Sequence, residues 1–359
     1  ASGVLMPVFS LPSKYGIGCF SKEAYKFVDQ LKKAGQSYWQ ILPLGPTGYG
    51  DSPYQSFSTY AGNPYFIDLK TLVKEGLLTK KECKEVRCKE QKKIDYEKIY
   101  QNRFKILKKA YRRFQKNDKY EKFLEENAFW LEDYCMYMAI KDAHEGKSWS
   151  EWEELLKKRE KTALEKVKEE LEDEIGFYQF QQYEFDRQWK KLHTYAKEQG
   201  IQIIGDIPIY VAFDSADAWA APELFQFDEE NNPIRVAGCP PDAFAKTGQL
   251  WGNPLYNWEY HQKTGYAWWI QRIRYCFQRY DVVRIDHFRG FDEYYAIPYG
   301  ESTAENGIWM PGPGMKLFQA IEKELGRPEI IAEDLGFLTE SVLQMLKESG
   351  FPGMKVLEF

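Results

Sequence analysis

The sequence predicts an α/β protein, a (β/α)8 TIM barrel with a helical insertion, of which about six strands lie within this chain. After residue 200, short β-rich runs alternate four times with helix-like stretches, a pattern typical of a parallel sheet with crossover helices. The first strand is not followed by GxGxxG, which argues against a dinucleotide-binding sheet. A barrel places its functional site at the carboxyl ends of its strands.

The first of three predicted zones, residues 1–70, is rich in Gly, Pro, Ser and Tyr. The apolar run "YWQILPL" at 38–44 predicts the first barrel strand, and "GPTGYGDSPYQSFSTYAGNPYF" after it predicts a long loop. Loops of this length in compact domains usually carry function.

The second zone, residues 71–200, changes to Lys, Glu, Leu and aromatic residues with few Gly or Pro. Apolar residues recur at helical spacing over 96–114 and 150–174, which predicts amphipathic helices. Glu is interleaved with Lys throughout, so these charged faces indicate solvent contact more than a membrane or nucleic-acid surface. We expect a helical insertion subdomain without chemistry of its own.

The third zone, residues 201–359, is expected to carry the catalytic part of the barrel. Its predicted strands are "IQIIGDIPIYV" (201–211), "DVVRIDHF" (281–288), "EIIAEDL" (329–335) and the start of another in "MKVLEF" (354–359). Its predicted helices cover 266–280, 314–326 and 339–350.

The strand "DVVRIDHF" places charged residues where desolvation is costly. Side chains alternate along a strand, so Arg284 and Asp286 face one side while Val283 and Ile285 face the other. In a barrel, the branched pair packs on the outer helices and the charged pair points inward. The alternative is a purely structural role, in which Arg284 and Asp286 form a buried ion pair that stabilises the barrel.

Three successive predicted strands each end in a carboxylate: Asp206, Asp286 and Glu333. If the last two strands are adjacent, the carboxyl groups of Asp286 and Glu333 lie within roughly 5–6 Å, the separation of a retaining glycosidase pair. Arg284 would keep Asp286 ionised as a nucleophile, and Glu333 has no basic neighbour, which favours a raised pKa. His287 is a candidate donor to a sugar hydroxyl, and Asp206 taken alone is equally compatible with capping a turn.

Composition limits the function classes. A net charge of −5 gives no reason to expect nucleic acid or an anionic membrane as a partner, and no run of 18 apolar residues is present. Six cysteines lack metal-site spacing, and the opening residues lack the pattern of a signal peptide. We expect reduced thiols in the cytoplasm, or in a plastid if a transit peptide was removed. No metal or other cofactor is expected.

The motifs "GDSPYQSFSTYAGNPY", "GDIPIYVAFDSADAWA", "PPDAFAKTGQLWGNPLYNW", "RIDHFRGF" and "AEDLG" together resemble those of the 4-α-glucanotransferases, the amylomaltase or disproportionating-enzyme family related to α-amylases. The resemblance covers nearly the whole chain. It implies a retaining transfer of α-1,4-glucan segments between maltooligosaccharides, including those derived from starch or glycogen.

The resemblance also implies residue roles. Asp286 corresponds to the nucleophile that forms a covalent glucosyl intermediate, and Glu333 to the acid/base. The residues that it assigns to substrate binding are Tyr54, Asp206, Asp242, Trp251, Asn253, Arg284 and His287. Trp251 lies in a Gly-flanked segment expected to be a loop that roofs the cleft. Aromatic faces suit the C–H faces of sugars, which offers a reason for the 16% aromatic content.

One departure concerns the end of the chain. Members of the family carry a third acidic residue in a His-Asp motif on a later strand, whereas this sequence stops at Phe359 inside the expected sixth strand. The expectation is an incomplete copy of a longer protein, whose open sheet edges would leave this piece unstable and inactive.

Two other functions remain open from the sequence. An α-glucan hydrolase would use the same two carboxylates, but it would not lengthen its substrate. A non-catalytic glucan-binding protein would keep the aromatic cleft, and its binding would survive the loss of Asp286 and Glu333.

Overall fold

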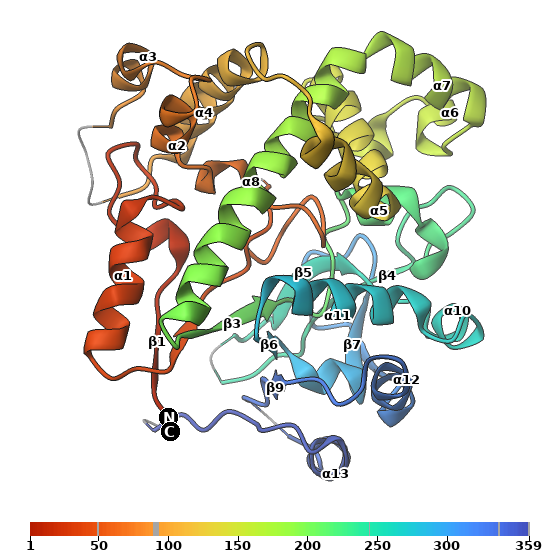
Figure 1. The fold of residues 1–359 in the computed structure, drawn as a ribbon. Helices are drawn as coiled ribbons and strands as arrows, with labels where there is room; N and C mark the ends of the chain where they lie inside the picture. Colours follow the sequence, from red (N-terminus) through yellow and green to blue (C-terminus); the bar gives the residue numbers. More distant parts are fainter. Residues whose placement is uncertain (49, 89–92, 244, 337, 358–359) are drawn as a thin grey trace. The chain divides into compact units, whose positions relative to one another are not determined.

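The structure, a computed structural model, describes residues 1–48, 50–88, 93–243, 245–336 and 338–357. Its contacts group the chain into two compact units (Figure 1). The first comprises Ala1–Pro53, Tyr60–Lys147 and Glu153–Ile204, and the second comprises Tyr54–Thr59, Ser148–Trp152 and Gly205–Phe359. The three zones of the sequence follow composition and remain a prediction about domains.

The first unit combines short parallel strands with a large helical part. Strand β2 (Tyr38–Gln40) lies in parallel between β1 (Gly3–Leu5) and the start of β3 (Gln202–Ile207). Its helices are α1 (Lys22–Lys33), α2 (Leu69–Lys74), α3 (Lys80–Glu85), α4 (Tyr96–Tyr111), α5 (Asp118–Ala143), α6 (Glu154–Lys157), α7 (Lys161–Glu170) and α8 (Glu172–Glu198), with 3-10 turns η1 (Val8–Ser10) and η2 (Pro64–Phe66).

The predicted helical zone is helical, but the stretch 150–174 is not one continuous helix. Helix α6 ends before Arg159, whose φ of 56° places it in the left-handed region that a right-handed helix does not use. Leu171, with φ −112°, then separates α7 from α8. Of the three helices, α8 carries most of the buried residues, α6 buries Leu156 and α7 buries none.

Most of the aromatic surplus packs inside the protein. Tyr183 of α8 meets the rings of Phe114, Tyr120 and Phe123 at centroid distances of 5.8, 5.3 and 5.7 Å. Seven of the 11 tryptophans are buried: Trp39, Trp130, Trp149, Trp152, Trp189, Trp219 and Trp269. The idea that a sugar cleft accounts for the aromatic content is therefore wrong for most of these rings, which stabilise the core.

The second unit continues the parallel strands. Its members are the end of β3, then β6 (Val282–Ile285) and β9 (Ile330–Ala332), in the order β3-β6-β9. Its helices are α9 (Ala216–Ala220), α10 (Trp258–Lys263), α11 (Ala267–Arg279), α12 (Met315–Leu325) and α13 (Glu340–Ser349), with 3-10 turns η3 (Trp149–Glu151), η4 (Pro222–Leu224) and η5 (Phe288–Phe291). Helices α11, α12 and α13 confirm the predicted helices, and β3, β6 and β9 the predicted strands.

Each predicted range that holds a strand extends beyond the strand observed there, and the run 38–44, expected as the first barrel strand, contains β2 (Tyr38–Gln40), which follows β1 in the chain. The strand expected over 201–211 ends at Ile207, because Pro208 has no N–H to continue a ladder. The freed carbonyl of Ile209 instead accepts hydrogen bonds from Arg272 Nη1 (3.0 Å) and the Tyr256 hydroxyl (2.7 Å). Residues 354–357 form no strand, and the rest of the strand expected there lies outside the described residues.

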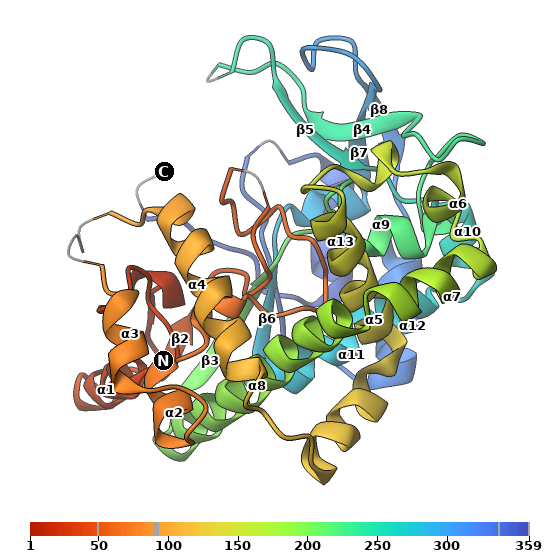
Figure 2. The same cartoon turned by 90° about the horizontal axis from the view of Figure 1, so that it is seen from above.

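An antiparallel sheet that the sequence reading missed completes the second unit (Figure 2). Its order is β5-β4-β7-β8, with β4 (Arg235–Cys239), β5 (Gln249–Pro254), β7 (Glu293–Pro298) and β8 (Ile308–Pro311). Trp251 lies on β5, so its expected place in a loop is wrong: β4 and β5 pair across a register shift that accommodates the Gly-rich sequence.

The alternation predicted for β6 is present. Val283 and Ile285 are fully buried, whereas the side chains of Arg284 and Asp286 are 11% and 34% exposed. The two charged residues therefore share the face that remains accessible. None of the helices in the described part of the chain has the length and hydrophobicity that crossing a bilayer requires.

Candidate active site

Three carboxylates gather where neighbouring parallel strands end. Asp206 is the penultimate residue of β3, Asp286 follows β6 directly and Glu333 follows β9 directly. Because β6 lies between β3 and β9, all three carboxylates lie at the carboxyl ends of neighbouring parallel strands. The prediction that successive strands deliver carboxylates to one place is confirmed.

Asp286 and Glu333 lie opposite one another. The register pairs Arg284 with Ile331 and Ile285 with Ala332, and the Glu333 N–H donates to the Ile285 carbonyl at 3.0 Å. Neighbouring strands are about 4.8 Å apart, so this register is compatible with the roughly 5–5.5 Å separation of a retaining carboxylate pair.

Arg284 connects two of the carboxylates. Its Nη1 donates to Asp206 Oδ1 at 2.6 Å, and its Nη2 lies 3.0 Å from Asp286 Oδ1. The Tyr54 hydroxyl donates to the other Asp206 oxygen at 2.6 Å. Both Asp206 oxygens are thus bonded, whereas Asp286 Oδ2 has no hydrogen-bond partner among the described residues and is available to a ligand.

Glu333 is held by the backbone of its neighbours. The His287 N–H donates to Glu333 Oε2 and the Leu335 N–H to Oε1, both at 2.8 Å. His287 itself adopts a left-handed conformation, with φ 54° and ψ 48°. This conformation is uncommon for a residue other than glycine.

The pKa shifts separate the carboxylates. Burial, with the nearby Asp286 charge, raises the pKa of Glu333, although its two backbone hydrogen bonds act in the opposite direction. Burial also raises the pKa of Asp206 to about 6, since the cost of desolvation outweighs the attraction of Arg284. His287 has its pKa lowered to about 4, first by burial and then by Arg289, so its ring is neutral at pH 7.

An aromatic group borders the carboxylates within the second unit. The His287 ring meets Trp251 edge to face at a centroid distance of 4.9 Å, and Tyr210 lies 6.4 Å from Trp251 and 6.5 Å from His287. Trp251 is partly exposed. The exposed part of an indole ring suits contact with a pyranose ring.

The remaining two predicted binding residues lie further from the carboxylates. Asn253 is buried, where its Nδ2 donates to the Val211 carbonyl at 2.7 Å and its Oδ1 accepts from Gln55 Nε2 at 3.1 Å. Gln55 follows Tyr54, so this pair anchors the segment that carries the Tyr54 ring. Asp242 lies in an exposed turn after β4, where its Oδ1 accepts from the Ala245 N–H at 2.6 Å.

Three residues of the site were not identified from the sequence: Tyr210, Gln55 and Met354. Met354 Sδ contacts Arg284 Nε at 3.2 Å, across 70 positions of the chain. Tyr210 and Gln55 stand within quoted motifs beside residues that were chosen, so their motif positions carried the signal. Nothing in the sequence marks Met354 as a neighbour of Arg284.

The described residues contain no group of three or more His, Cys, Asp or Glu side chains arranged to hold a metal ion. The groups at this end of the sheet are two aspartates bridged by a guanidinium and a glutamate whose pKa is raised by burial. This set is suited to nucleophilic and acid/base work at a glycosidic bond.

Comparison with known proteins agrees with this chemistry. A family model described as 4-alpha-glucanotransferase matches residues 6–359. The chain is 51% identical over 358 residues to a 4-alpha-glucanotransferase of Clostridium butyricum, covering 99% of this chain and 74% of that protein. It is 47% identical to one of Thermus thermophilus, of which it covers 72%.

A solved structure is similar along the whole chain. An amylomaltase from Streptococcus agalactiae, in complex with acarbose, superposes with a TM-score of 0.97 at 44% identity, covering 100% of this chain and 74% of that one. An amylomaltase from Corynebacterium glutamicum, at 19% identity and a TM-score of 0.78, shares the fold. By the extent of these matches, the chain belongs to the 4-alpha-glucanotransferase family.

Proposed function

We propose that this protein is a retaining 4-α-glucanotransferase that moves α-1,4-glucan segments between maltooligosaccharides. The observation that supports this most directly is the pairing of Asp286 with Glu333 across β6 and β9, with an arginine bonded to one and burial raising the pKa of the other. A nucleophile requires a carboxylate held in position, and a general acid requires a carboxyl group of raised pKa.

In the first half of the reaction, Asp286 Oδ2 attacks the anomeric carbon of the donor. The glycosidic C1–O4 bond breaks and Glu333 gives its proton to the departing O4, which leaves a glucosyl ester on Asp286. Arg284 lies 3.0 Å from Oδ1 of the same carboxylate, so it orients the attacking group.

In the second half, the 4-hydroxyl of an acceptor sugar takes the place of the departed group. Glu333, now ionised, removes the hydroxyl proton while the new C1–O4 bond forms and the ester bond to Asp286 breaks. Two inversions at C1 give net retention.

The binding residues are assigned by where they lie. We assign Tyr54, Asp206, Arg284 and His287 to the sugar at the cleavage point, since they surround Asp286. Trp251 is assigned to stacking on a neighbouring sugar, because it is partly exposed and its ring contacts His287. Asn253 acts through Gln55 on the Tyr54 segment, and Asp242 is assigned to the glucan chain on the strength of the family motif alone.

Transfer instead of hydrolysis requires that the ester outlives contact with water until an acceptor binds. The ring cluster of Trp251, Tyr210 and His287 beside the carboxylates supports acceptor stacking and a low water content there. Six free cysteines agree with the proposed cytoplasmic location.

The test is incubation of the purified protein with maltotriose, followed by chromatography of the products. We expect glucose together with a ladder of maltooligosaccharides longer than the substrate. In Asp286→Asn, product formation falls about 10⁴-fold or more, because the nucleophile is lost while a neutral isostere keeps the packing. Circular dichroism of the variant checks that the fold is retained.

Other outcomes would identify the alternatives. Glucose and maltose without longer products would identify a hydrolase. Glucan binding that is unchanged in Asp286→Asn, with no turnover by either protein, would identify a binding module and contradict the proposed transferase.

A further inference from the structure

A pocket of about 400 Å³ lies in the first unit, and none of its lining residues belongs to the candidate active site. Three helices contribute the side chains that matter for its chemistry: Lys22 and Tyr25 from α1, Lys70 and Lys74 from α2, and Arg187 and Lys191 from α8. Its volume falls within the range of small-molecule sites, about 300–1,000 Å³.

The charge around this pocket is unlike that of the whole chain. The protein carries a net charge of −5, yet five of the ten residues that line the pocket are cations and only one, Asp68, is an acid. The pocket is therefore an electropositive spot on an acidic protein, and an anion would be attracted to it.

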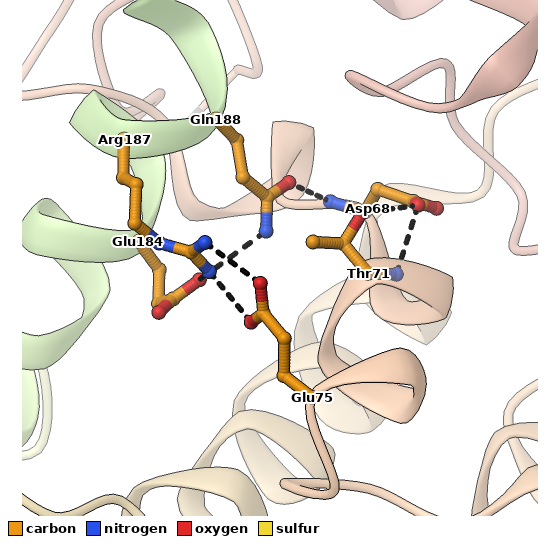
Figure 3. Close-up of polar contacts among 6 residues, drawn as sticks. All are labelled: Asp68, Thr71, Glu75, Glu184, Arg187 and Gln188. Atoms are coloured by element: carbon orange, nitrogen blue, oxygen red, sulfur yellow. Dashed lines mark hydrogen bonds and ion pairs between the residues drawn. The ribbon is translucent and has the colours of Figure 1, made fainter. Parts of the chain in front are cut away.

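The arginine among these cations is already occupied. Arg187 Nη1 and Nη2 each donate at 2.7 Å to Glu75, and Nη2 also donates to Glu184 at 2.6 Å (Figure 3). Gln188 extends this network, since its Oε1 accepts from the Asp68 N–H at 2.8 Å and its Nε2 donates to Glu184 at 3.3 Å. These bonds fix the wall that α2 and α8 share.

The lysines, by contrast, are unsatisfied. Lys70, Lys74 and Lys191 form no ion pair or hydrogen bond within the part of the chain that the structure describes. Lys70 and Lys74 are four residues apart on α2, so this helix presents a like-charged pair on one face. Such a pair is mutually destabilising until a counter-charge binds.

Helix α1 adds to the same field. Lys22 stands in its first turn, where the positive end of the helix dipole disfavours a cation. Its contact with Glu23 is 3.4 Å long, and because Lys22 is 75% exposed this contact neutralises little. An anion in the pocket would thus meet ammonium groups from three helices together with a helix N-terminus.

The rest of the lining indicates what the anion is attached to. Tyr25 is half-buried, its ring packs on Tyr195 at a centroid distance of 5.1 Å, and its hydroxyl makes no hydrogen bond within the described residues. The other lining ring, Phe20, packs against Phe66, Phe185 and Trp189. The Tyr25 and Thr71 hydroxyls suit a small polyol, and the volume far exceeds what one inorganic anion needs.

We propose that this pocket is a binding site for a phosphorylated monosaccharide, with its phosphate on Lys70, Lys74 and Lys191 and its sugar against Tyr25 and Thr71. Thr71 Oγ1 donates to Asp68 at 2.9 Å, so its lone pairs remain to accept from a sugar hydroxyl. This site is separate from the proposed transferase function and does not depend on it.

The test is calorimetric titration of the protein with glucose 6-phosphate, with inorganic phosphate and glucose as separate arms. We expect one molecule to bind per chain, more tightly than phosphate and more weakly as salt is added, and glucose not to bind at this site. In Lys74→Gln/Lys191→Gln the affinity falls about tenfold or more, since two charge-assisted contacts are lost.

The matched control is Lys26→Gln/Lys197→Gln, which removes the same charge from exposed positions of α1 and α8 that do not line the pocket. It should bind as the unaltered protein does, and both double variants should retain transferase activity and thermal stability. Equal affinity for phosphate and glucose 6-phosphate would show an adventitious ion only. Equal weakening in both double variants, or loss of binding in Asp286→Asn, would place the ligand elsewhere and overturn the proposal.

Discussion

Arg284 is the side chain on which the ionic network of the candidate site depends. It bonds Asp206, which is 1% exposed, and Asp286, which is 34% exposed, so it joins a sealed carboxylate to an accessible one. Tyr54 also donates to Asp206, so Asp206 is held in place and in turn orients the Arg284 guanidinium. The guanidinium then holds Asp286 in one orientation. The proposed nucleophile is positioned by contacts that no substrate needs to form.

The raised pKa of Glu333 predicts the alkaline side of the pH profile. A general acid must be protonated at the start of the reaction, so kcat/KM falls as pH rises through the pKa of Glu333 in the folded protein. The measurement is the initial rate of maltotriose conversion across pH. A rate that keeps increasing above neutral pH would argue against Glu333 as the acid.

The same residue is tested by a donor that needs no acid. In Glu333→Gln, conversion of maltotriose should fall by a factor on the order of 10³, while α-maltosyl fluoride should still release fluoride at close to the normal rate. Fluoride leaves without a proton, so Asp286 alone suffices for this step. Equal loss with both donors would indicate that the variant disturbs the site more widely.

Tyr54 offers a test of the support behind Arg284. Tyr54→Phe removes the 2.6 Å hydrogen bond to a buried, charged Asp206, and kcat/KM should fall about tenfold or more. The control is Tyr299→Phe, at a hydroxyl on a side chain that is 54% exposed and outside the site. An unchanged kcat/KM in Tyr54→Phe would show that Asp206 holds Arg284 without this bond.

At the scale of elements, the strands that carry the site are short and depend on close packing. Strand β3 brings Gly205 against the ring of Tyr280, and a Cβ at this position would lie 2.3 Å from two ring atoms. The ring is 6% exposed and precedes β6, so it cannot turn into solvent freely. A glycine next to Asp206 therefore sets how near α11 and its following residue approach the sheet.

Gly205→Ala should accordingly destabilise the protein by about 1–3 kcal/mol through overpacking, measured as a shift in the urea midpoint. The double variant Gly205→Ala/Tyr280→Ala should lose less than the sum of the two single changes, since the alanine methyl fills part of the vacated space. Additive losses would mean that the ring is not what the methyl group meets.

The elements show how much could be predicted from the sequence and why the rest could not. Strands β3, β6 and β9 were predicted because their β-branched residues alternate with charges, and their carboxylates were located for the same reason. The sheet of β4, β5, β7 and β8 was missed, because Gly and Pro in "GCPPDAFAKTGQLWGNP" indicate a loop, and the bulged pairing that accommodates them is tertiary. The role of Gln55 behind Tyr54 depends on that pairing.

At the scale of the molecule, the chain forms two compact units whose chemistry differs. The second unit holds the carboxylates and the antiparallel sheet, whereas the first holds most of the helices and the lysine-lined pocket. All six cysteines are free thiols distributed over both units, four of them buried. Their accessibility therefore reports on the folding of the whole chain.

Alkylation should follow this burial. Iodoacetamide added to the native protein at pH 8 should modify Cys88 first, since Cys19, Cys83, Cys135 and Cys276 are buried. Cys239 should react slowly, because burial raises its pKa to about 11 and leaves little thiolate. Peptide mass spectrometry over time gives the order, and the protein in denaturant should carry six modifications. Early modification of a buried thiol would reveal local opening of its unit.

The left-handed residue at the end of β6 has a consequence for the stereochemistry of the reaction. The peptide that joins Asp286 to His287 carries the attacking carboxylate on one side and, through the N–H, the anchor for Glu333 on the other. The distance between the two acids is thus constrained by one amide group, which follows Asp286 and donates to Glu333. This link contains no loop or hinge whose lengthening would separate the two acids. An inverting variant, which needs a gap wide enough for a water molecule, is accordingly not reachable by remodelling surface loops. It would require this turn of backbone to be rebuilt.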